Sequence, residues 1–186
     1  MLASPPRFAS LAPQVHKVIL PGGLLLLLAG LYWGLFVAPT DQQQGEVYRV
    51  IYVHVPAAWM SMFLYLVACF YAALNWVYRS DVSAVMMRAL LPTGAWMTAL
   101  ALITGALWGK PTWGTYWVWD ARMSTELLLL FIYLGLMALA QLSVNPSKTD
   151  RLLAVALLIG AVNIPMIYLS VIFMNTLHQG YSVSLS

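Results

Sequence analysis

The sequence predicts an all-α membrane protein, a polytopic bundle of five transmembrane helices in a single domain. Of its 186 residues, 62% are hydrophobic and only 8% are charged, and the mean hydropathy is +0.80, a composition typical of membrane proteins. Five apolar runs are long enough to cross a hydrocarbon core of ~30 Å, and none alternates with the period of two that marks barrel strands. No repeat or linker divides residues 1–186, so we expect one integral-membrane unit.

The first apolar run covers about residues 19–37 and follows Arg7 and Lys17. Its exit lacks the small-x-small pattern of a signal-peptide cleavage site, which favours a retained anchor. The other four runs are predicted at about 51–78, 89–108, 123–142 and 152–173. In the last of them, Asn163 and Pro165 interrupt an apolar helix and predict a kink.

Basic residues are distributed unequally between the two faces that five spans define. One face would carry six Lys and Arg residues and the other three, which by the positive-inside rule puts the first face in the cytoplasm. The first set is Arg7, Lys17, Arg79, Arg88, Lys148 and Arg151, and the second is Arg49, Lys110 and Arg122. The stretch 108–122 then lies in a loop or short surface helix on the outer side.

That stretch, 108–122, holds four of the eight tryptophans: Trp108, Trp113, Trp117 and Trp119. Its glycines, proline and charged residues exclude the middle of a lipid-facing helix. One interpretation is an aromatic belt at the membrane boundary, where indole rings bury their bodies and keep the N–H in water. The other is a flat aromatic platform for a flat ligand, which the density of indoles favours.

Two histidines share the predicted outer face with the tryptophans. His54 lies at the outer start of the second run and His178 just past the outer end of the fifth, whereas His16 lies on the opposite side. A lone histidine near a helix end is usually structural. Two on one face could instead bind iron from opposite sides of a flat macrocycle and fill both axial positions.

Charged and polar residues near the same boundary give further candidates. Arg49 and Arg122 offer planar forks for carboxylates, although contact with lipid phosphates explains each equally well. Arg122 and Glu126 are spaced to pair on a helix, and a structural ion pair is the simpler role for Glu126. Asp120 is the other acidic residue near the fourth run. The hydroxyl of Ser170 either faces a ligand or bonds back to a carbonyl.

The composition also excludes several classes of protein. The net charge of +3 comes from scattered basic residues, so nucleic acid is not expected as a partner. The single cysteine, Cys69, can form no disulfide within the chain, and there is no Cys-x-x-Cys-His motif for covalent haem attachment.

Three motifs, in this order, resemble one family. They are Arg49-Val-Ile-Tyr-Val-His-Val-Pro-Ala-Ala58, Trp113-Gly-Thr-Tyr-Trp-Val-Trp-Asp-Ala-Arg122 and Asn175-Thr-Leu-His-Gln-Gly180. The second is similar to the tryptophan-rich signature of the WWD-domain haem-handling proteins of cytochrome c assembly. Together they resemble the haem exporter protein C (CcmC) family over essentially the whole chain.

The resemblance implies a bacterial inner-membrane protein, without catalytic residues, that presents non-covalent b-type haem at the periplasmic face. It makes His54 and His178 the axial ligands and makes the loop a cradle for the ring. The residues implied in cofactor binding are Trp113, Trp117, Trp119, Asp120, Arg49 and Arg122, and the position of Ser170 before His178 adds it as a further candidate. The implied partners are the haem chaperone CcmE, the small membrane protein CcmD and the ABC transporter CcmA with CcmB, besides membrane lipid.

The same resemblance raises a difference in length and leaves other functions open. Members of the family look like six-span proteins, whereas this chain stops eight residues beyond His178. We expect either a fragment that lacks the sixth helix, which we favour, or a genuinely short version. One alternative function is a b-type electron carrier with permanently bound haem, which would need histidines on facing spans inside the bundle. A WWD-type haem lyase and a permease without cofactor are the others.

Overall fold

The computed structural model describes residues 5–142, 145–174 and 176–178, and these residues form helices joined by loops, without a strand. Five segments are long and apolar enough to span a membrane. They are Ala9–Val37, Glu46–Tyr78, Asp81–Trp113, Ala121–Ala140 and Pro146–Phe173. The predicted all-α bundle with five spans is confirmed.

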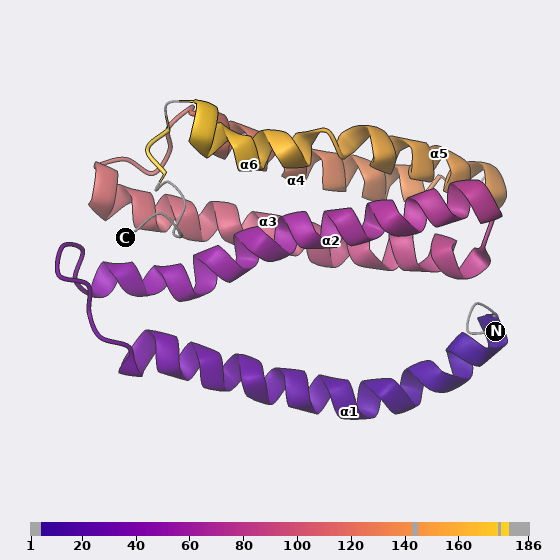
Figure 1. Cartoon of the computed structure of the whole chain (residues 1–186), viewed down its shortest axis with the longest axis horizontal. Coiled ribbons are helices and arrows are strands. Elements are labelled where there is room, and N and C mark those ends of the chain that lie inside the picture. The colour runs from indigo at the N-terminus through magenta and orange to yellow at the C-terminus, as the bar shows by residue number, and fades with distance from the viewer. Residues whose placement is uncertain (1–4, 143–144, 175, 179–186) are drawn as a thin grey trace.

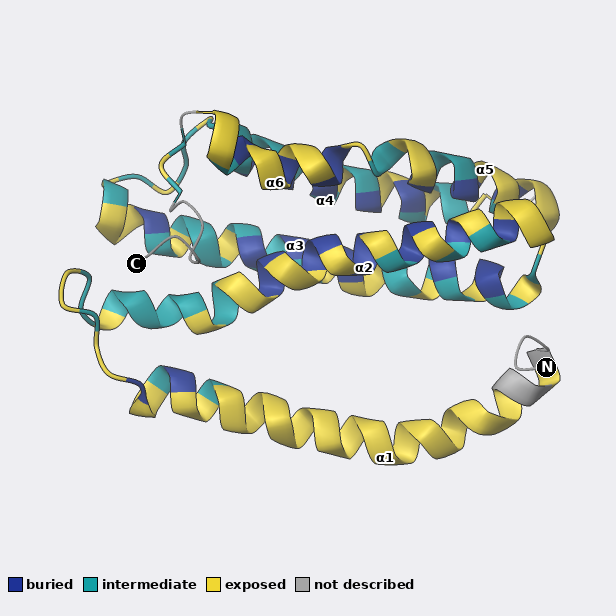
Figure 2. Cartoon of the chain, in the orientation of Figure 1, coloured by how far each residue is buried: buried dark blue, intermediate teal, exposed yellow. Residues whose placement is uncertain are grey.

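The first helix, α1 (Pro5–Tyr32), runs beside the other helices instead of among them (Figure 1). It ends in a π-helical turn, η1 (Trp33–Val37), and is exposed along nearly its whole length (Figure 2). Its contact with the bundle lies at this end, where Gly34 is buried against the ring of Tyr52. Apolar side chains on all sides are suited to lipid, because lipid requires no polar face.

The next two helices, α2 (Ile51–Tyr78) and α3 (Asp81–Trp113), form an antiparallel hairpin. A 3-10 turn, η2 (Glu46–Val50), leads into α2. Helix α2 ends where Arg79 adopts a left-handed conformation (φ 51°) and its N–H bonds to the carbonyl of Asn75. Ser80 then caps α3 by accepting a hydrogen bond from the N–H of Ser83. The left-handed residue that ends α2 and the serine that caps α3 together form the tight turn between the two helices.

The last two spans are α4 (Ala121–Ala140) and a broken helix made of α5 (Pro146–Gly160) and α6 (Asn163–Phe173). The break lies at residues 161–162 and confirms the interruption predicted from Asn163 and Pro165. Proline removes a hydrogen bond from the preceding turn. The Asn163 side chain donates to the carbonyl of Thr125 (3.0 Å) and ties the break to α4.

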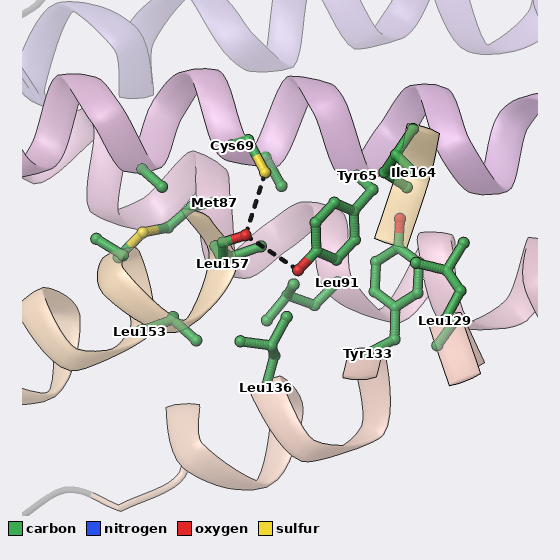
Figure 3. Packing of buried hydrophobic residues seen from close by; sticks show 14 of the residues in the cluster. Tyr65, Cys69, Met87, Leu91, Leu129, Tyr133, Leu136, Leu153, Leu157 and Ile164 are labelled. Atoms are coloured by element: carbon green, nitrogen blue, oxygen red, sulfur yellow. Dashed lines mark hydrogen bonds between the residues drawn. The ribbon is translucent and has the colours of Figure 1, made fainter. Parts of the chain in front are cut away.

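The core lies between α2, α3, α4 and the α5–α6 span (Figure 3). Tyr65 and Tyr133 are fully buried there, with ring centroids 5.3 Å apart. The Tyr133 hydroxyl donates to the carbonyl of Ser61 (2.8 Å), and the Tyr65 hydroxyl donates to that of Leu157 (3.1 Å). Such bonds satisfy polar groups that would otherwise be costly in an apolar bundle.

The tryptophan stretch 108–122 is partly helical, whereas the sequence predicts a loop or short surface helix there. Helix α3 continues through Trp108 to Trp113, and only residues 114–120 form the connection to α4. Gly114 ends the helix with a left-handed backbone (φ 82°), and its N–H bonds to the carbonyl of Lys110. Pro111 does not stop the helix, since membrane helices tolerate proline when other groups satisfy the freed backbone.

Candidate functional site

A cavity of about 320 Å³ lies at the end of the bundle where α2 begins and α3 ends. Its volume falls within the range of ~300–1,000 Å³ typical of small-molecule sites. It is lined by Gln44, Ile51, His54, Val55, Ala58, Trp59, Met62, Gly105, Trp108, Thr112, Trp113, Arg122, Tyr168, Val171, Leu177 and His178. The structure thus brings both predicted outer histidines to one cavity. Four spans separate them, and an even number of crossings returns the chain to the same face.

His54 lies in the first turn of α2, and its ring is oriented by α3. Its Nδ1 is 3.0 Å from the carbonyl oxygen of Ala101 and 3.2 Å from the hydroxyl of Thr104. A carbonyl oxygen can only accept, so this hydrogen bond places the proton on Nδ1 and leaves a lone pair on Nε2. Gly105 provides room for the ring, because a Cβ there would lie 2.9 Å from His54 Cε1.

His178 follows α6 and packs beside α3, with its ring centroid 5.4 Å from that of Trp113. Its Nδ1 is 3.7 Å from Oδ2 of Asp120, and its backbone N–H donates to the hydroxyl of Thr176 (2.9 Å). Burial and the nearby positive charge of Arg122 hold the pKa of His178 below its usual value, although Asp120 acts in the opposite direction. At neutral pH the imidazole is therefore uncharged, the form that can bind a metal.

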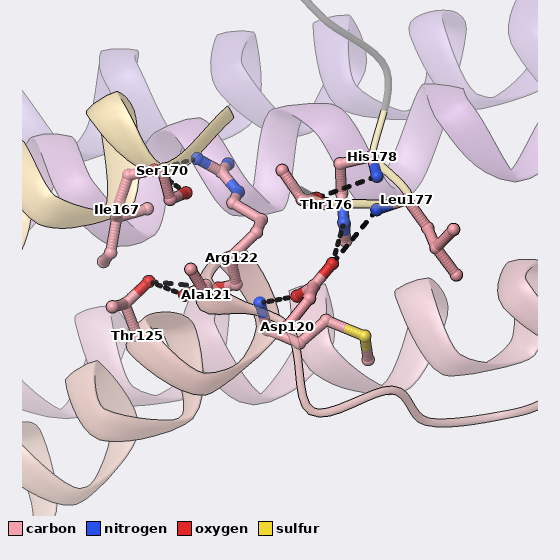
Figure 4. Close-up of polar contacts among 10 residues, drawn as sticks. Asp120, Ala121, Arg122, Thr125, Ile167, Ser170, Thr176, Leu177 and His178 are labelled. Carbon is pink, nitrogen blue, oxygen red and sulfur yellow. Dashed lines mark hydrogen bonds and ion pairs between the residues drawn. The ribbon is translucent and has the colours of Figure 1, made fainter. Parts of the chain in front are cut away.

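Asp120 joins the start of α4 to the segment that carries His178 (Figure 4). Its Oδ1 accepts from the N–H of Met123 (2.8 Å), which caps α4, and its Oδ2 accepts from the N–H of Leu177 (3.3 Å). Burial by itself raises the pKa of the Asp120 carboxyl. These hydrogen bonds, another from Thr176 and the nearby His178 lower that pKa by more than burial raises it, so the net pKa is below its usual value. The carboxylate is charged at neutral pH and orients the segment 176–178.

Asp120→Ala is expected to destabilise the protein by about 0.5–2 kcal/mol, the usual cost of losing an N-cap. It should also speed hydrogen exchange at the amides of residues 176–178, because Leu177 loses its acceptor. The matched control is Asn145→Ala, which removes the cap that Asn145 provides to Lys148 N on α5. Thermal unfolding and exchange mass spectrometry check both effects; equal exchange in the two variants would contradict the tethering role.

Arg122 and Glu126 both face the interior at the start of α4, but they do not form the ion pair that their spacing predicts. No Arg122–Glu126 contact within 4.0 Å occurs among the described ion pairs. The Arg122 guanidinium instead donates to the carbonyl of Ile167 on α6 (2.9 Å, Figure 4). The carboxylate of Glu126 accepts from the hydroxyl of Ser61 on α2 (2.8 Å). Each side chain is drawn to a different neighbouring helix, so the predicted pair is wrong.

The four tryptophans of the stretch separate into two pairs. Trp108 and Trp113, both on α3, line the cavity, and the Trp108 ring lies edge-on to His54 with centroids 5.8 Å apart. Trp117 and Trp119 are not among the described cavity-lining residues; their rings meet at 77°, and Trp119 is 77% exposed. In the ligand-free structure only two of the four indoles line the cavity, and the rings of the other two are not coplanar.

Two other predicted site residues are engaged away from the cavity. Arg49 pairs with Glu46 and donates to the carbonyl of Gly34 (3.2 Å), so its guanidinium ties η2 to the end of α1. Ser170 is 1% exposed and donates to the carbonyl of Ile167 (2.7 Å). Of the two roles predicted for Ser170, the structure shows the hydrogen bond back to a carbonyl of its own helix.

Several residues that line the cavity were not singled out from the sequence. On α2, His54, Ala58 and Met62 follow one another at intervals of four, the spacing of one helical face. Counting along the predicted helix in steps of four from His54 would have selected Ala58 and Met62 as well. Trp59 and Tyr168 carry no such signal, because their place at the cavity depends on how α2 and α6 are set in the bundle.

The arrangement combines two imidazoles, three indole rings and one guanidinium around a largely apolar cavity. Imidazole nitrogens bind transition metals, indoles contact flat rings, and a guanidinium pairs with carboxylates. The fold and the cavity define a multi-pass helical membrane protein with a cavity at one end that is lined by two histidines and three tryptophans.

Comparison with known proteins specifies the family. The profile of the heme exporter protein C (CcmC) family matches residues 1–186, and the chain belongs to this family. It is 45% identical to heme exporter protein C of Bradyrhizobium diazoefficiens over 98% of this chain and 69% of the relative. The Escherichia coli K12 protein of the same name is 42% identical over 96% and 73%. A putative cytochrome c biosynthesis ccmC-like mitochondrial protein of Marchantia polymorpha is 42% identical over 86% and 67%.

Proposed function

We propose that this protein holds haem non-covalently between His54 and His178 and passes it on for cytochrome c maturation. Membership of the heme exporter protein C family supports a role in haem handling in that process. The proposal treats haem as cargo that is bound and released, and it requires no catalytic residue in this chain. It also treats residues 1–186 as one haem-handling domain.

The observation that carries this proposal is the orientation of the two imidazoles. Nδ1 of His54 faces a backbone carbonyl and Nδ1 of His178 faces a carboxylate. Metal-binding histidines commonly direct one ring nitrogen to such an acceptor, which fixes the ring and leaves the other nitrogen for the metal. Both Nε2 atoms are therefore the proposed axial ligands.

The other cavity residues suit the remaining parts of a porphyrin. Haem supplies an iron with two axial positions, an apolar ring and two propionates. Trp108 and Trp113 would contact the ring, and Arg122 would pair with a propionate, since its guanidinium has one described hydrogen bond and lines the cavity. Trp59 also lines the cavity, is 60% exposed and would cover one side of the ring.

Five further residues remain candidates from the family resemblance. Asp120 would act by orienting His178, as its contacts with residues 177 and 178 suggest. Trp117 has a buried indole Nε1 without an acceptor among the described residues, and a ligand oxygen would satisfy it. For Trp119, Arg49 and Ser170, contact with haem would require side-chain movement.

The cellular setting of the site is part of the proposal. Five spans support a multi-pass membrane protein. From the asymmetry of basic residues we propose that the histidine cavity faces the periplasmic side of the inner membrane. We propose that haem leaves this cavity for the chaperone CcmE, with CcmD and the ABC transporter CcmA and CcmB as neighbours. Asn175, Gln179 and Gly180 of the third motif lie outside the described residues.

Haem titration of the purified protein tests this proposal. We expect absorption and electron paramagnetic resonance spectra of six-coordinate, low-spin iron, because two imidazoles leave no open axial position. A high-spin spectrum, or no binding, would rule out the two-histidine site.

A second step distinguishes transfer from permanent binding. When the loaded protein is mixed with purified apo-CcmE, its haem spectrum should fall while the acceptor gains haem. If the haem never leaves, and the iron is instead reduced and reoxidised in place, the b-type electron carrier is the better description.

A further inference from the structure

A second, much smaller cavity adjoins the histidine cavity and has a different chemical character. Its volume is about 20 Å³, and a single water requires roughly 10–15 Å³ by this kind of measure. It is lined by His54, Ala58, Ala101, Leu102, Gly105, Arg122, Met123, Glu126 and His178. Four of these nine carry polar or charged groups, which is unusual for a cavity among membrane-spanning helices.

Glu126 contributes a polar atom to this cavity that the protein itself leaves unsatisfied. The residue is only 6% exposed. Its Oε1 accepts from the hydroxyl of Ser61, whereas its Oε2 is buried without a hydrogen-bond donor among the described residues. A buried carboxylate oxygen without a donor is energetically costly, so a donor from outside the chain is expected.

Arg122 presents the matching donors on the same helix, one turn before Glu126. One of its nitrogens donates to the carbonyl of Ile167, and no other hydrogen bond is described for it. A guanidinium has five N–H donors. The two opposite charges line one cavity but lie too far apart for a direct ion pair.

We propose that one ordered water occupies this small cavity, accepts a hydrogen bond from Arg122 and donates one to Oε2 of Glu126. The water completes an Arg122–water–Glu126–Ser61 chain that links α4 to α2. Glu126 is thereby a positioning residue that holds Arg122 at the wall of the histidine cavity. This hydration site is a property of the ligand-free protein and does not depend on the proposed binding of haem.

The alternative is that the small cavity is dry, and the polarity of its lining argues against this. Genuinely empty cavities in proteins are lined by apolar side chains, whereas polar ones of sufficient size hold water. A dry cavity would leave Oε2 of the buried Glu126 without any hydrogen-bond partner, an arrangement that is costly in an apolar interior.

X-ray hydroxyl-radical footprinting of the haem-free protein in nanodiscs tests the proposal. In this method X-rays form the radicals from water itself, both bulk and protein-bound, and no other reagent is added. Radicals formed from an ordered water oxidise the side chains around it, and Met123 lines the cavity while being only 6% exposed. Two sulfur residues of the dry core are matched references: Cys69, 8% exposed, and Met87, fully buried. Met123 should be oxidised well above both.

Two substitutions assign the water to Glu126. Glu126→Gln keeps an acceptor oxygen and should retain the oxidation of Met123, whereas Glu126→Leu removes the acceptor and should lower it to the level of Met87. Oxidation of Met123 at the level of Cys69 and Met87 in the unaltered protein would overturn the hydration site. Oxidation unchanged in a folded Glu126→Leu variant would overturn the role of Glu126. If that variant does not fold, the comparison within the unaltered protein still decides the proposal.

Discussion

Replacement of either His54 or His178 by alanine is expected to remove haem binding almost completely. Residues that only orient a metal ligand typically contribute 10–100-fold to affinity, so loss of a ligand itself should cost at least about 100-fold. Haem titration followed by absorption spectroscopy measures the loss. The low-spin spectrum should disappear in both variants, because one remaining imidazole leaves an axial position open.

The third histidine is the matched control for this experiment. His16 is exposed on α1 and does not line either cavity, so His16→Ala should bind haem like the unaltered protein. Added imidazole should restore the low-spin spectrum of the His54→Ala and His178→Ala variants, which a merely structural role would not allow. Full haem occupancy with an unaltered spectrum in both alanine variants would remove the proposed site.

Gly94→Ala is expected to have the largest effect on folding, a destabilisation of about 2–4 kcal/mol. A Cβ at this position would overlap the ring of Tyr133, which is fully buried and hydrogen-bonded through its hydroxyl to Ser61. Overpacking of a close-packed core costs about 1–3 kcal/mol, and a lost buried hydrogen bond adds about as much. Unfolding of the detergent-solubilised protein by heat or by denaturant measures the change.

Gly135→Ala on α4 provides the control, since a Cβ there would meet no atom within 4 Å. It should be neutral or slightly stabilising, because alanine favours a helix over glycine by about 0.5–1 kcal/mol. A second change, Tyr133→Leu, should recover part of the stability lost in Gly94→Ala by removing the overlap. Equal stability of the two single glycine variants would show that the ring of Tyr133 can move aside.

The packing of α3 against α4 at Gly94 follows from the three-dimensional arrangement and could not be foreseen. A glycine in a membrane helix is common, and nothing in the sequence says which large side chain it faces. Gly160 makes the same kind of approach to Tyr65. The two glycines and two tyrosines meet only after α2, α3, α4 and α5 have been assembled.

The candidate site was predictable only in part. The sequence analysis selected four residues by their type, their place near the membrane boundary and the number of membrane crossings between them. All four line the cavity: His54, His178, Trp113 and Arg122. The predicted pairing of Arg122 with Glu126 failed, because spacing on one helix permits a contact but competing partners on other helices decide it. The partners on these helices are the carbonyl of Ile167, which accepts from Arg122, and the hydroxyl of Ser61, which donates to Glu126, and neither has a sequence signal.

The sequence alone determined that this chain crosses a membrane as five helices and that two histidines and a tryptophan-rich stretch meet at one end. The length of the apolar runs is sufficient for the first conclusion, because backbone groups in lipid must be hydrogen-bonded within a helix. The number of membrane crossings between these residues is sufficient for the second. Only the tertiary structure decided which way each side chain points. It turned Trp108 and Trp113 toward the cavity, kept Trp119 at the surface and separated Arg122 from Glu126, because these choices depend on contacts between helices distant in the chain.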